Sequence, residues 1–373
     1  MACPKILFVA GDLSGDQHAA DVARAIKTLR PDAEISAVGG PALRAVADVF
    51  LDDLVSQGVM GFWEPLKKIP HFWRVLHRVV KPAVDRVDVV VPTDFFGFNQ
   101  HVARAGKAAG KKVFYLISPQ VWASRPGRIQ VLKKYVDRML VLFPFEEALY
   151  KQAGVPVTFI GHPFLDRLPP ADPEAPLNVE PVIGLLPGSR KGEVRRHLPL
   201  FLRTAGLLAR PSRRFLLFAA PNLSDDFYDE VIGPRDRRAF PLEIVRDEKY
   251  RRRSGLDLAL TCSGSATLEN ALLGIPMVVA YQTSWLTYEI AKRIVRVEHI
   301  AMANILAGRR LVPELIQDQA TPEGLAAAAE ELLQDPARRR ALRRELLSLR
   351  DKLGGPGAAA RAAESILSGL GKI

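Results

Sequence analysis

Two short stretches of the sequence combine small hydroxyl residues, glycine and a charged side chain, a combination suited to binding an anion. The first, Ser263-Gly264-Ser265-Ala266-Thr267, lies between an apolar run and a helical pattern. Backbone N–H groups lack helical partners at a helix start, where the dipole is positive, so a diphosphate suits this position. Glu269 follows about one turn later, where its carboxylate can accept hydrogen bonds from a sugar diol such as ribose. A capping box is the structural alternative.

The second stretch, Pro187-Gly188-Ser189-Arg190, also follows an apolar run and precedes a helical pattern. The Arg190 guanidinium can pair with a diphosphate and neutralise the charge that develops on a departing group. Pro-Gly also marks ordinary turns, so an exposed arginine in a plain turn is the alternative. With the first stretch, this loop predicts a site for a diphosphate-containing donor.

Candidate proton acceptors gather at two other places in the sequence. Asp12, Ser14, Asp16 and His18 follow the first apolar run, and Asp94 follows another. A carboxylate or imidazole there can take the proton from an attacking hydroxyl group. The alternative for each aspartate is N-capping of the next helix. Capping is the favoured interpretation for Asp16, and both interpretations stay open for Asp94.

Two further motifs carry weaker signals. His162 lies in Gly161-His162-Pro163 at the end of an expected strand, where it either touches a ligand or braces a hinge. Gly11 and Gly15 do not form the G-x-G-x-x-G pattern. The sequence therefore lacks the dinucleotide fingerprint of a dehydrogenase.

The elements that position these residues read as alternating strands and helices. Apolar runs predict strands at residues 6–10, 87–91, 113–117, 139–143, 182–186, 215–219, 256–261 and 277–281. Helical spacing follows at 17–29 and 193–208, and a last helix is expected at 358–370. In open α/β sheets, ligands bind outside the carboxyl ends of the strands, which is where the polar residues fall.

The chain of 373 residues is longer than the size at which one core usually divides. We expect an N-terminal Rossmann-like domain at 1–168, a proline-rich linker at 169–181 and a second Rossmann-like domain at 182–350. The segment 351–373 is expected to pack back on the N-terminal domain. Two α/β domains facing each other across a cleft are the expected architecture.

Composition narrows the compartment and the partners. Residues 1–12 pass directly into a strand, and no run of about 18 uncharged apolar residues occurs, which predicts a cytoplasmic protein. The net charge of +11 implies an anionic partner, namely nucleic acid, a membrane surface or a phosphorylated substrate. Cys3 and Cys262 lie in or beside expected buried strands and are interpreted as reduced packing residues.

A basic, apolar segment at 65–84 suggests where such a partner binds. Its cations are Lys67, Lys68, Arg74, Arg78 and Lys81, and it contains no acid. The aromatic residues in or beside it are Phe62, Trp63, Phe72 and Trp73. An interfacial helix explains both features, and nucleic-acid binding is the rival. The membrane is preferred because Val75, Leu76, Val79 and Val80 add an aliphatic face that bases do not need.

The order of motifs along the chain resembles the lipid-A-disaccharide synthase family, glycosyltransferases of the two-domain GT-B fold. The resemblance runs to about Glu323. The matching motifs are Ala10-Gly11-Asp12-Leu13-Ser14-Gly15-Asp16, Val59-Met60-Gly61-Phe62-Trp63-Glu64, Ser118-Pro119-Gln120-Val121-Trp122-Ala123, Phe143-Pro144-Phe145-Glu146, Phe159-Ile160-Gly161-His162-Pro163, Leu186-Pro187-Gly188-Ser189-Arg190, Ser263-Gly264-Ser265-Ala266-Thr267-Leu268-Glu269, Pro276-Met277-Val278-Val279-Ala280-Tyr281 and Asn304-Ile305-Leu306-Ala307-Gly308-Arg309.

The resemblance implies an inverting transfer that joins UDP-2,3-diacylglucosamine to 2,3-diacylglucosamine 1-phosphate, giving a β-1,6-linked disaccharide phosphate and UDP. It implies no metal, no other cofactor and no nucleic acid. Asp94 is then the leading base for the 6-hydroxyl of the acceptor, with Asp12 and His18 as alternatives. Asp16 is also placed among the catalytic residues, and Arg190 stabilises the departing UDP.

Site residues beyond these also follow from the resemblance. The two glycine-containing loops, Glu269 and Asn304 are expected to bind the donor. The acceptor and the cytoplasmic surface of the inner membrane, with its anionic lipids, are expected to meet Ser14, Met60, Phe62, Trp63, Lys67, Lys68, Phe72, Trp73, Arg74 and His162. A homodimer is one expectation for the oligomeric state.

The chain departs from the family pattern at three places. Asp94-Phe95-Phe96-Gly97-Phe98-Asn99 keeps the first Asp of Asp-x-Pro-Asp-Phe-Asn and lacks the Pro and the second Asp. Met302-Ala303-Asn304 keeps only the Asn of Leu-Pro-Asn, and Asp12 replaces the usual Glu. We expect the reaction class to survive with an altered acyl or acceptor preference. A UDP-sugar 2-epimerase and an inactive nucleic-acid-binding or scaffold protein are the competing hypotheses.

Overall fold

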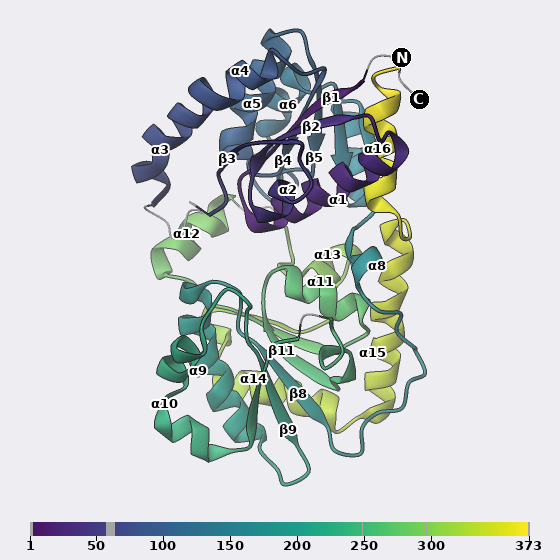
Figure 1. The fold of residues 1–373 in the computed structure, drawn as a ribbon. Coiled ribbons are helices and arrows are strands. Elements are labelled where there is room, and N and C mark those ends of the chain that lie inside the picture. Colours follow the sequence, from purple (N-terminus) through teal and green to yellow (C-terminus); the bar gives the residue numbers. More distant parts are fainter. Residues whose placement is uncertain (1–2, 57–63, 248, 295–296, 372–373) are drawn as a thin grey trace. The chain divides into compact units, whose positions relative to one another are not determined.

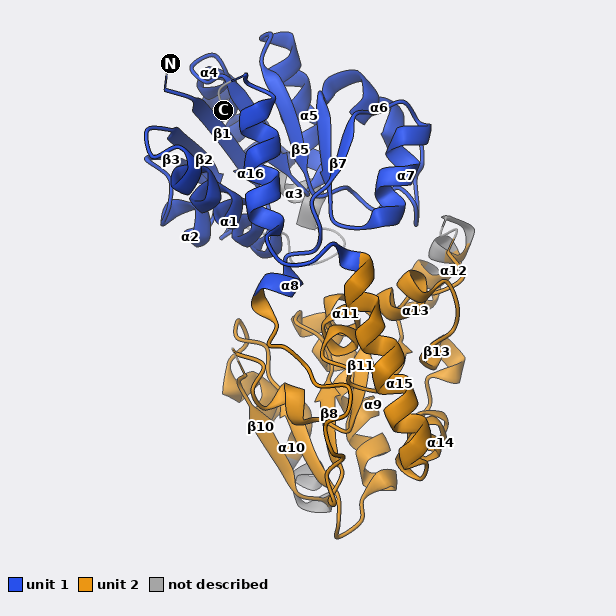
Figure 2. Ribbon diagram, turned by 90° about the vertical axis from the view of Figure 1, so that its right-hand side faces the viewer, with its two compact units in different colours: residues 1–166, 353–373 blue, residues 167–352 orange. Residues whose placement is uncertain are grey.

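The computed structural model describes residues 3–56, 64–247, 249–294 and 297–371 (Figure 1). The chain divides into two compact units (Figure 2). Unit 1 comprises residues 1–166 and 353–373, and unit 2 comprises 167–352. Among the described residues, no helix is long and apolar enough to cross a membrane.

Unit 1 contains a parallel seven-stranded sheet in the order β3-β2-β1-β4-β5-β6-β7. Its strands are β1 (Lys5–Ala10), β2 (Glu34–Gly39), β3 (Val49–Asp53), β4 (Val89–Thr93), β5 (Lys112–Leu116), β6 (Arg138–Val141) and β7 (Val157–Phe159). The order reverses between β1 and β4, which register Ile6 against Val89. Such a reversal is the point at which doubly wound sheets bind ligands.

Helices pack on both faces of this sheet, and β1 is apolar at successive positions because both of its sides are buried. The helices of this part of the chain are α1 (Leu13–Leu29), α2 (Pro41–Arg44), α3 (Glu64–Val75), a π-helical turn (Leu76–Val80), α4 (Lys81–Val84), α5 (Phe96–Ala108), α6 (Arg128–Tyr135), α7 (Pro144–Gln152), α8 (Phe164–Arg167) and α16 (Ala358–Ser368). Ile6 and Phe8 of β1 belong to the cluster formed with α1 and α16, and Leu7 belongs to the cluster formed with α4 and α5.

The last helix therefore belongs to unit 1. Ala362, Ala363 and Ile366 of α16 are buried in the cluster that contains α1. The Arg361 guanidinium Nε donates to the Ile160 carbonyl at 2.7 Å. The chain returns to its N-terminal unit after passing through unit 2.

Unit 2 contains a parallel six-stranded sheet in the order β10-β9-β8-β11-β12-β13. Its strands are β8 (Val182–Leu186), β9 (Arg214–Phe218), β10 (Leu242–Val245), β11 (Leu258–Cys262), β12 (Met277–Tyr281) and β13 (Glu314–Ile316). Its helices are α9 (Lys191–Leu208), α10 (Asp225–Ala239), α11 (Ser265–Leu272), α12 (Trp285–Ile294), α13 (Met302–Ala307), α14 (Pro322–Leu333) and α15 (Pro336–Ser348). The prediction of two Rossmann-like α/β domains is confirmed.

The proline-rich stretch 169–181 contains no helix or strand and packs against unit 2. The Asn178 side-chain amide donates to Asp257 Oδ2 at 2.7 Å, and the Arg344 guanidinium pairs with Glu174 at 2.6 Å. These contacts attach the stretch to the body of unit 2.

Two local expectations were wrong. Helix α1 begins at Leu13, four residues earlier than the helical pattern predicts, because Asp12 is its N-cap. Cys262 is buried as expected, but Cys3 is exposed ahead of β1 and its thiol contacts the Asp32 carbonyl. Cys3 is therefore not a packing residue of the core.

Candidate functional site

Asp94 lies directly after β4, in a backbone conformation that few residues adopt. Asp94 and Phe95 have φ angles of 44° and 41°, in the left-handed region that costs free energy for side chains other than glycine. The surrounding structure holds this turn in place. The Asp94 carbonyl accepts hydrogen bonds from the Tyr115 hydroxyl at 2.6 Å and from the Asn99 side-chain amide at 2.9 Å.

The glycine at the end of β1 makes room for this turn. A Cβ atom on Gly11 would lie 2.1 Å from Cδ1 of the Phe95 ring. Phe95 in turn packs against Phe72 and Phe98, with ring centroids 5.7 and 6.4 Å away. Gly11 therefore serves close packing at this position.

The Asp94 carboxyl group is an unusually strong base for an aspartate. Its pKa is raised to about 6, chiefly by burial and secondly by the neighbouring charge of Asp12. The Phe95 backbone N–H and the Arg128 guanidinium oppose this shift. The group is ionised at neutral pH and still basic enough to accept a proton from a hydroxyl group, which is what general-base catalysis requires.

The other candidate bases differ sharply in what their carboxylates already bind. Asp12 caps α1, accepting from the Gly15 N–H at 2.8 Å. Asp16 is 1% exposed and accepts from the backbone N–H groups of Gly40, Ala42 and Leu43 at 2.7, 2.9 and 3.2 Å. Asp16 thereby stabilises the start of α2, whereas the sequence favoured capping of the helix expected at 17–29. Asp16 is a structural residue, which corrects its placement among the catalytic candidates.

Three other predicted site residues of unit 1, Ser14, His18 and His162, differ from one another in exposure. Ser14 is exposed in the first turn of α1, and His18 is buried within that helix. His162 is also buried, with ring centroids 5.2 Å from Phe143 and 4.6 Å from Phe164. Its Nδ1 accepts the Phe164 backbone N–H at 3.2 Å. This packing favours the bracing interpretation of His162.

The basic segment forms a continuous helical stretch through α3, the π-helical turn and α4, and its residues face two ways. Phe72 packs with Phe95 and Phe98, and Val75 and Val80 are fully buried. The aliphatic face that favoured a membrane over nucleic acid is therefore largely part of the core, which corrects that argument. Apolar and basic groups still reach the surface. Ile69, Trp73, Arg74 and Arg78 are exposed.

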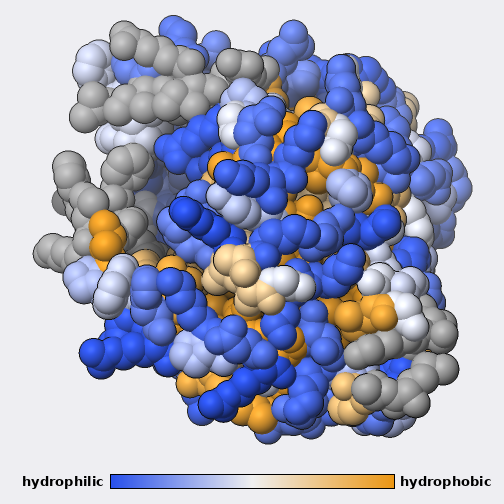
Figure 3. Space-filling model, turned by 90° about the horizontal axis from the view of Figure 1, so that it is seen from above, coloured by the Kyte–Doolittle hydropathy of each residue, from blue (hydrophilic) through white to orange (hydrophobic). Residues whose placement is uncertain are grey.

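Trp73 is the most prominent of these groups, being 60% exposed and stacked on His77 at 4.3 Å. Met60, Phe62 and Trp63 lie outside the described residues, as do the side chains of Lys67 and Lys68. Hydrophilic residues cover most of the face drawn in Figure 3, interrupted by smaller hydrophobic areas.

Sequence reasoning gave no role to Glu146, a buried carboxyl group at the start of α7. Burial raises its pKa to about 7, although Phe143 N–H and the Trp122 indole donate to it at 3.2 Å each. The signal available was its place three residues after Phe143, the capping-box spacing. Glu146 ties the loop after β5 to the loop after β6.

In unit 2, Arg190 is the N-cap of α9, and its guanidinium is 80% exposed. It pairs with Glu193 Oε1 at 2.7 Å. The other Glu193 oxygen accepts from the Ser189 and Arg190 backbone N–H groups at 3.1 and 3.3 Å. Gly188 has a φ of 118°, and a Cβ there would lie 2.7 Å from Glu193. In this structure the exposed Arg190 guanidinium is therefore paired with the Glu193 carboxylate three residues later.

The Ser263–Thr267 loop presents an open helix start. Gly264 and Ser265 are exposed, and α11 has no side-chain cap. The hydroxyl of Ser263 donates to the Ile300 carbonyl at 2.9 Å, and that of Thr267 donates to the Gly264 carbonyl at 2.8 Å. The capping-box alternative is wrong, because Glu269 does not reach the helix start.

Glu269 is bound by a buried arginine that sequence reasoning missed. Arg253 Nη1 pairs with Glu269 Oε2 at 2.6 Å, and its Nε donates to Asn270 at 2.8 Å. The Tyr250 hydroxyl donates to Glu269 Oε1 at 3.1 Å. Arg253 stands in a run of three arginines that reads as solvent-exposed, so no local signal marks it.

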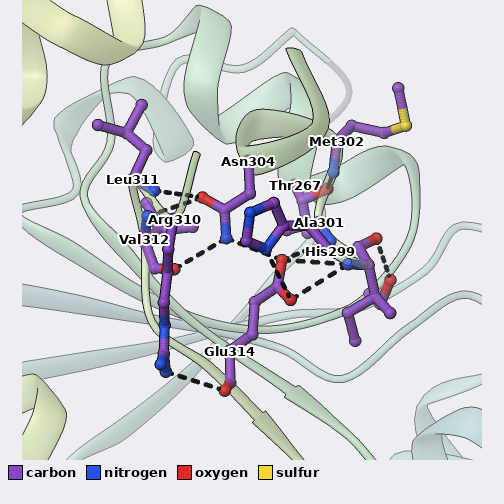
Figure 4. Close-up of polar contacts among 11 residues, drawn as sticks. Thr267, His299, Ala301, Met302, Asn304, Arg310, Leu311, Val312 and Glu314 are labelled. Atoms are coloured by element: carbon purple, nitrogen blue, oxygen red, sulfur yellow. Dashed lines mark hydrogen bonds and ion pairs between the residues drawn. The ribbon is translucent and has the colours of Figure 1, made fainter. Parts of the chain in front are cut away.

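The side-chain amide of Asn304 forms all of its hydrogen bonds inside unit 2 (Figure 4). Its Oδ1 accepts from the backbone N–H groups of Leu311 and Val312 at 2.7 and 2.8 Å. Its Nδ2 donates to the Val312 carbonyl at 2.9 Å and to Glu314 at 2.8 Å. Because all four hydrogen-bonding positions are occupied and the residue is 0% exposed, Asn304 does not contact a donor directly.

Glu314 completes this network by accepting from the Ile300 and Ala301 backbone N–H groups, at 3.1 and 2.8 Å. The Thr267 hydroxyl accepts from Met302 N–H at 3.1 Å. Asn304 and Glu314 therefore position the start of α13 against the Ser263–Thr267 loop.

Comparisons with known proteins show the family and the fold of the chain. A family model described as lipid-A-disaccharide synthetase matches residues 6–363. The lipid-A-disaccharide synthase of Geobacter metallireducens is 41% identical, over 99% of this chain and 98% of that protein. Among solved structures, Staphylococcus aureus MnaA with UDP has a TM-score of 0.64 at 13% identity, covering 99% of this chain and 98% of that chain. The calicheamicin glycosyltransferase CalG4 has a TM-score of 0.58 at 18% identity, covering 100% of both.

Proposed function

The chain belongs to the lipid-A-disaccharide synthase family, and we propose that Asp94 accepts the proton of the attacking hydroxyl while two loops of unit 2 hold the UDP group. The enzyme is a glycosyltransferase that joins UDP-2,3-diacylglucosamine to 2,3-diacylglucosamine 1-phosphate and forms the lipid A disaccharide. The buried, basic carboxyl group of Asp94 at the end of β4 is the observation that carries the proposal.

The proposed step is a single displacement. The 6-hydroxyl oxygen of the acceptor forms a bond to C1 of the donor sugar as the bond from C1 to the diphosphate oxygen breaks. The hydroxyl proton passes to Asp94, and UDP leaves with the bonding electrons. Attack from the side opposite the leaving group inverts the configuration at C1. The Asp12 charge adds to the rise in the Asp94 pKa that burial produces, so Asp12 acts on the reaction through Asp94.

The proposed donor contacts come from unit 2. The open start of α11 and the exposed Ser265 offer N–H and hydroxyl donors to a diphosphate. Arg190 pairs with the departing UDP by sharing or leaving Glu193. Glu269 accepts hydrogen bonds from the ribose, because each of its oxygens keeps a lone pair beyond the contacts with Arg253 and Tyr250.

We further propose that the enzyme works as a peripheral protein on the cytoplasmic surface of the inner membrane. The exposed Ile69 and Trp73 provide an apolar anchor, and Arg74 and Arg78 provide charge for anionic lipids. Flotation with anionic vesicles tests this, with loss of binding expected for Trp73→Ser combined with Arg74→Glu and Arg78→Glu. Unchanged flotation would count against the surface. Light scattering of the parent tests for a homodimer.

The catalytic proposal is tested by incubation with both lipid substrates and mass detection of disaccharide phosphate and UDP. Removing the base in Asp94→Ala is expected to lower kcat by about 10²-fold or more. Arg190→Ala is expected to lose at least about tenfold. Arg195→Ala is the matched control, since Arg195 is also an exposed, ion-paired arginine of α9. A parent without product would refute the function, and undiminished variants would refute these roles.

A further inference from the structure

Two arginines at the start of α6 take no part in the proposed step: Arg125 in the preceding loop and Arg128 as the first residue of the helix. The charge of Arg128 acts on Asp94. Arg125 precedes Arg128 by one turn, and the Arg128 N–H donates to the Arg125 carbonyl at 3.1 Å. The segment 118–136 contains both arginines and no acid. Within the part of the chain that the structure describes, neither guanidinium forms an ion pair. The pair is a local excess of positive charge.

Arg128 is held in a fixed orientation. Its guanidinium carbon lies 4.7 Å from the centroid of the Phe96 ring, and the residue is partly buried. Stacking on an aromatic face leaves the N–H edge of a guanidinium available for a planar, bidentate partner such as a phosphate. Phe96 begins α5, directly after the turn that contains Asp94.

Arg125 adds a second cation in a constrained backbone. It has a φ of 53°, an uncommon conformation for a residue other than glycine and one that clusters at ligand-binding sites. The positive charge of Arg125 lowers the pKa of Arg128, after the larger effect of burial. The two guanidinium groups therefore repel each other, and an anion bound between them would relieve that repulsion.

We propose that Arg125 and Arg128 bind the phosphomonoester of the acceptor and so bring the acceptor to Asp94. This inference rests on the proposed function, because the acceptor carries a 1-phosphate. A phosphomonoester has close to two negative charges at neutral pH, which two arginines balance. Asp94 cannot fill this role as a counter-ion, since it forms no ion pair with either arginine at 4.0 Å or less in the described structure.

The test compares two acceptors, 2,3-diacylglucosamine with and without its 1-phosphate. In Arg125→Gln and Arg128→Gln we expect kcat/KM for the phosphorylated acceptor to fall by about tenfold or more, through a higher KM. The dephosphorylated acceptor, used more slowly by the parent, is expected to change less than about threefold in the same variants. Arg128→Lys should recover part of the loss. Lys134→Gln is the matched control, since Lys134 is an exposed cation of α6.

The outcomes separate the possible failures. Equal losses with both acceptors, or no loss with either, would overturn the phosphate site while leaving the function intact. A parent that forms disaccharide from neither acceptor would overturn both. The same variants are floated with vesicles of phosphatidylglycerol, to distinguish lipid headgroup phosphates from the acceptor phosphate. Lost flotation with an unchanged preference between acceptors would assign the arginines to the membrane and overturn the inference.

Discussion

Replacing Asp94 by Asn is expected to make the protein more stable at pH 8 while it loses activity. The pKa of the Asp94 carboxyl group rises from 3.8 to about 6, so ionisation costs about 3 kcal/mol more in the folded chain than in the unfolded chain. The native state binds more protons than the unfolded state between these pH values, so stability falls as pH rises through them. The penalty is complete above about pH 6.

Asp94→Asn removes the charge and keeps the shape of the side chain. Asn also tolerates the left-handed backbone conformation found here. At pH 8 the variant is at most about 3 kcal/mol more stable than the parent. At pH 4.5, where the parent carboxyl group is mostly protonated, the same linkage reduces this gain in stability to about 1 kcal/mol. For a unit of this size 1 kcal/mol shifts Tm by about 2–4 °C, so the full gain corresponds to a rise of about 6–12 °C at pH 8, which is the upper limit that we expect.

The assay is thermal unfolding of the parent and the variant at both pH values. Asp16→Asn is the matched control, because its carboxylate accepts three backbone N–H bonds. That variant is expected to lose about 1–3 kcal/mol. An Asp94→Asn protein that is no more stable than the parent at pH 8, or whose gain is equal at both pH values, would refute the reasoning.

Three more substitutions probe the packing around the site. Gly11→Ala drives a Cβ into the Phe95 ring and should cost about 1–3 kcal/mol and at least tenfold in kcat; an unchanged Tm would show that the turn after β4 adapts. Arg253→Ala breaks a nearly buried ion pair with Glu269. Unfolding assays should show a loss of about 3–5 kcal/mol in stability, and kinetic assays should show a raised KM for the donor. An unaltered donor KM would remove Glu269 from the donor site. Gly97→Asp restores the family residue at a position where a Cβ meets nothing within 4 Å. The position lies in the first turn of α5, where a negative charge is favourable, so Tm should hold or rise by the equivalent of about 0.3–1 kcal/mol. A falling Tm would contradict this.

The strand positions were predictable because each strand near the centre of a parallel sheet is a short apolar run. The runs at 6–10, 182–186 and 277–281 became β1, β8 and β12 with bounds equal or nearly equal to those expected. Buried strands of this kind need no alternation of polar residues, so the apolar run alone identifies them. Asp94 was predictable for the same reason, as a polar residue at the carboxyl end of such a run.

Contacts made across the sequence were not predictable. The Asp16 carboxylate accepts hydrogen bonds from backbone N–H groups between Gly40 and Leu43, and the Asn304 side chain is hydrogen-bonded to backbone groups around Val312. Neither partner is marked by composition or spacing, because the fold alone brings them together. Phe72 likewise reads as a surface aromatic beside cations, and only the tertiary packing turns it toward Phe95.

The pH dependence of disaccharide formation tests the central claim, that Asp94 accepts the proton of the acceptor hydroxyl. With both lipid substrates, kcat/KM of the parent is expected to rise tenfold per pH unit below a pKa of about 6 and to level off above it. In Asp94→Asn the value should be about 10²-fold lower or more, without this limb. An Asp94→Asn enzyme that keeps the limb, or retains activity within tenfold of the parent at pH 8, would contradict the account.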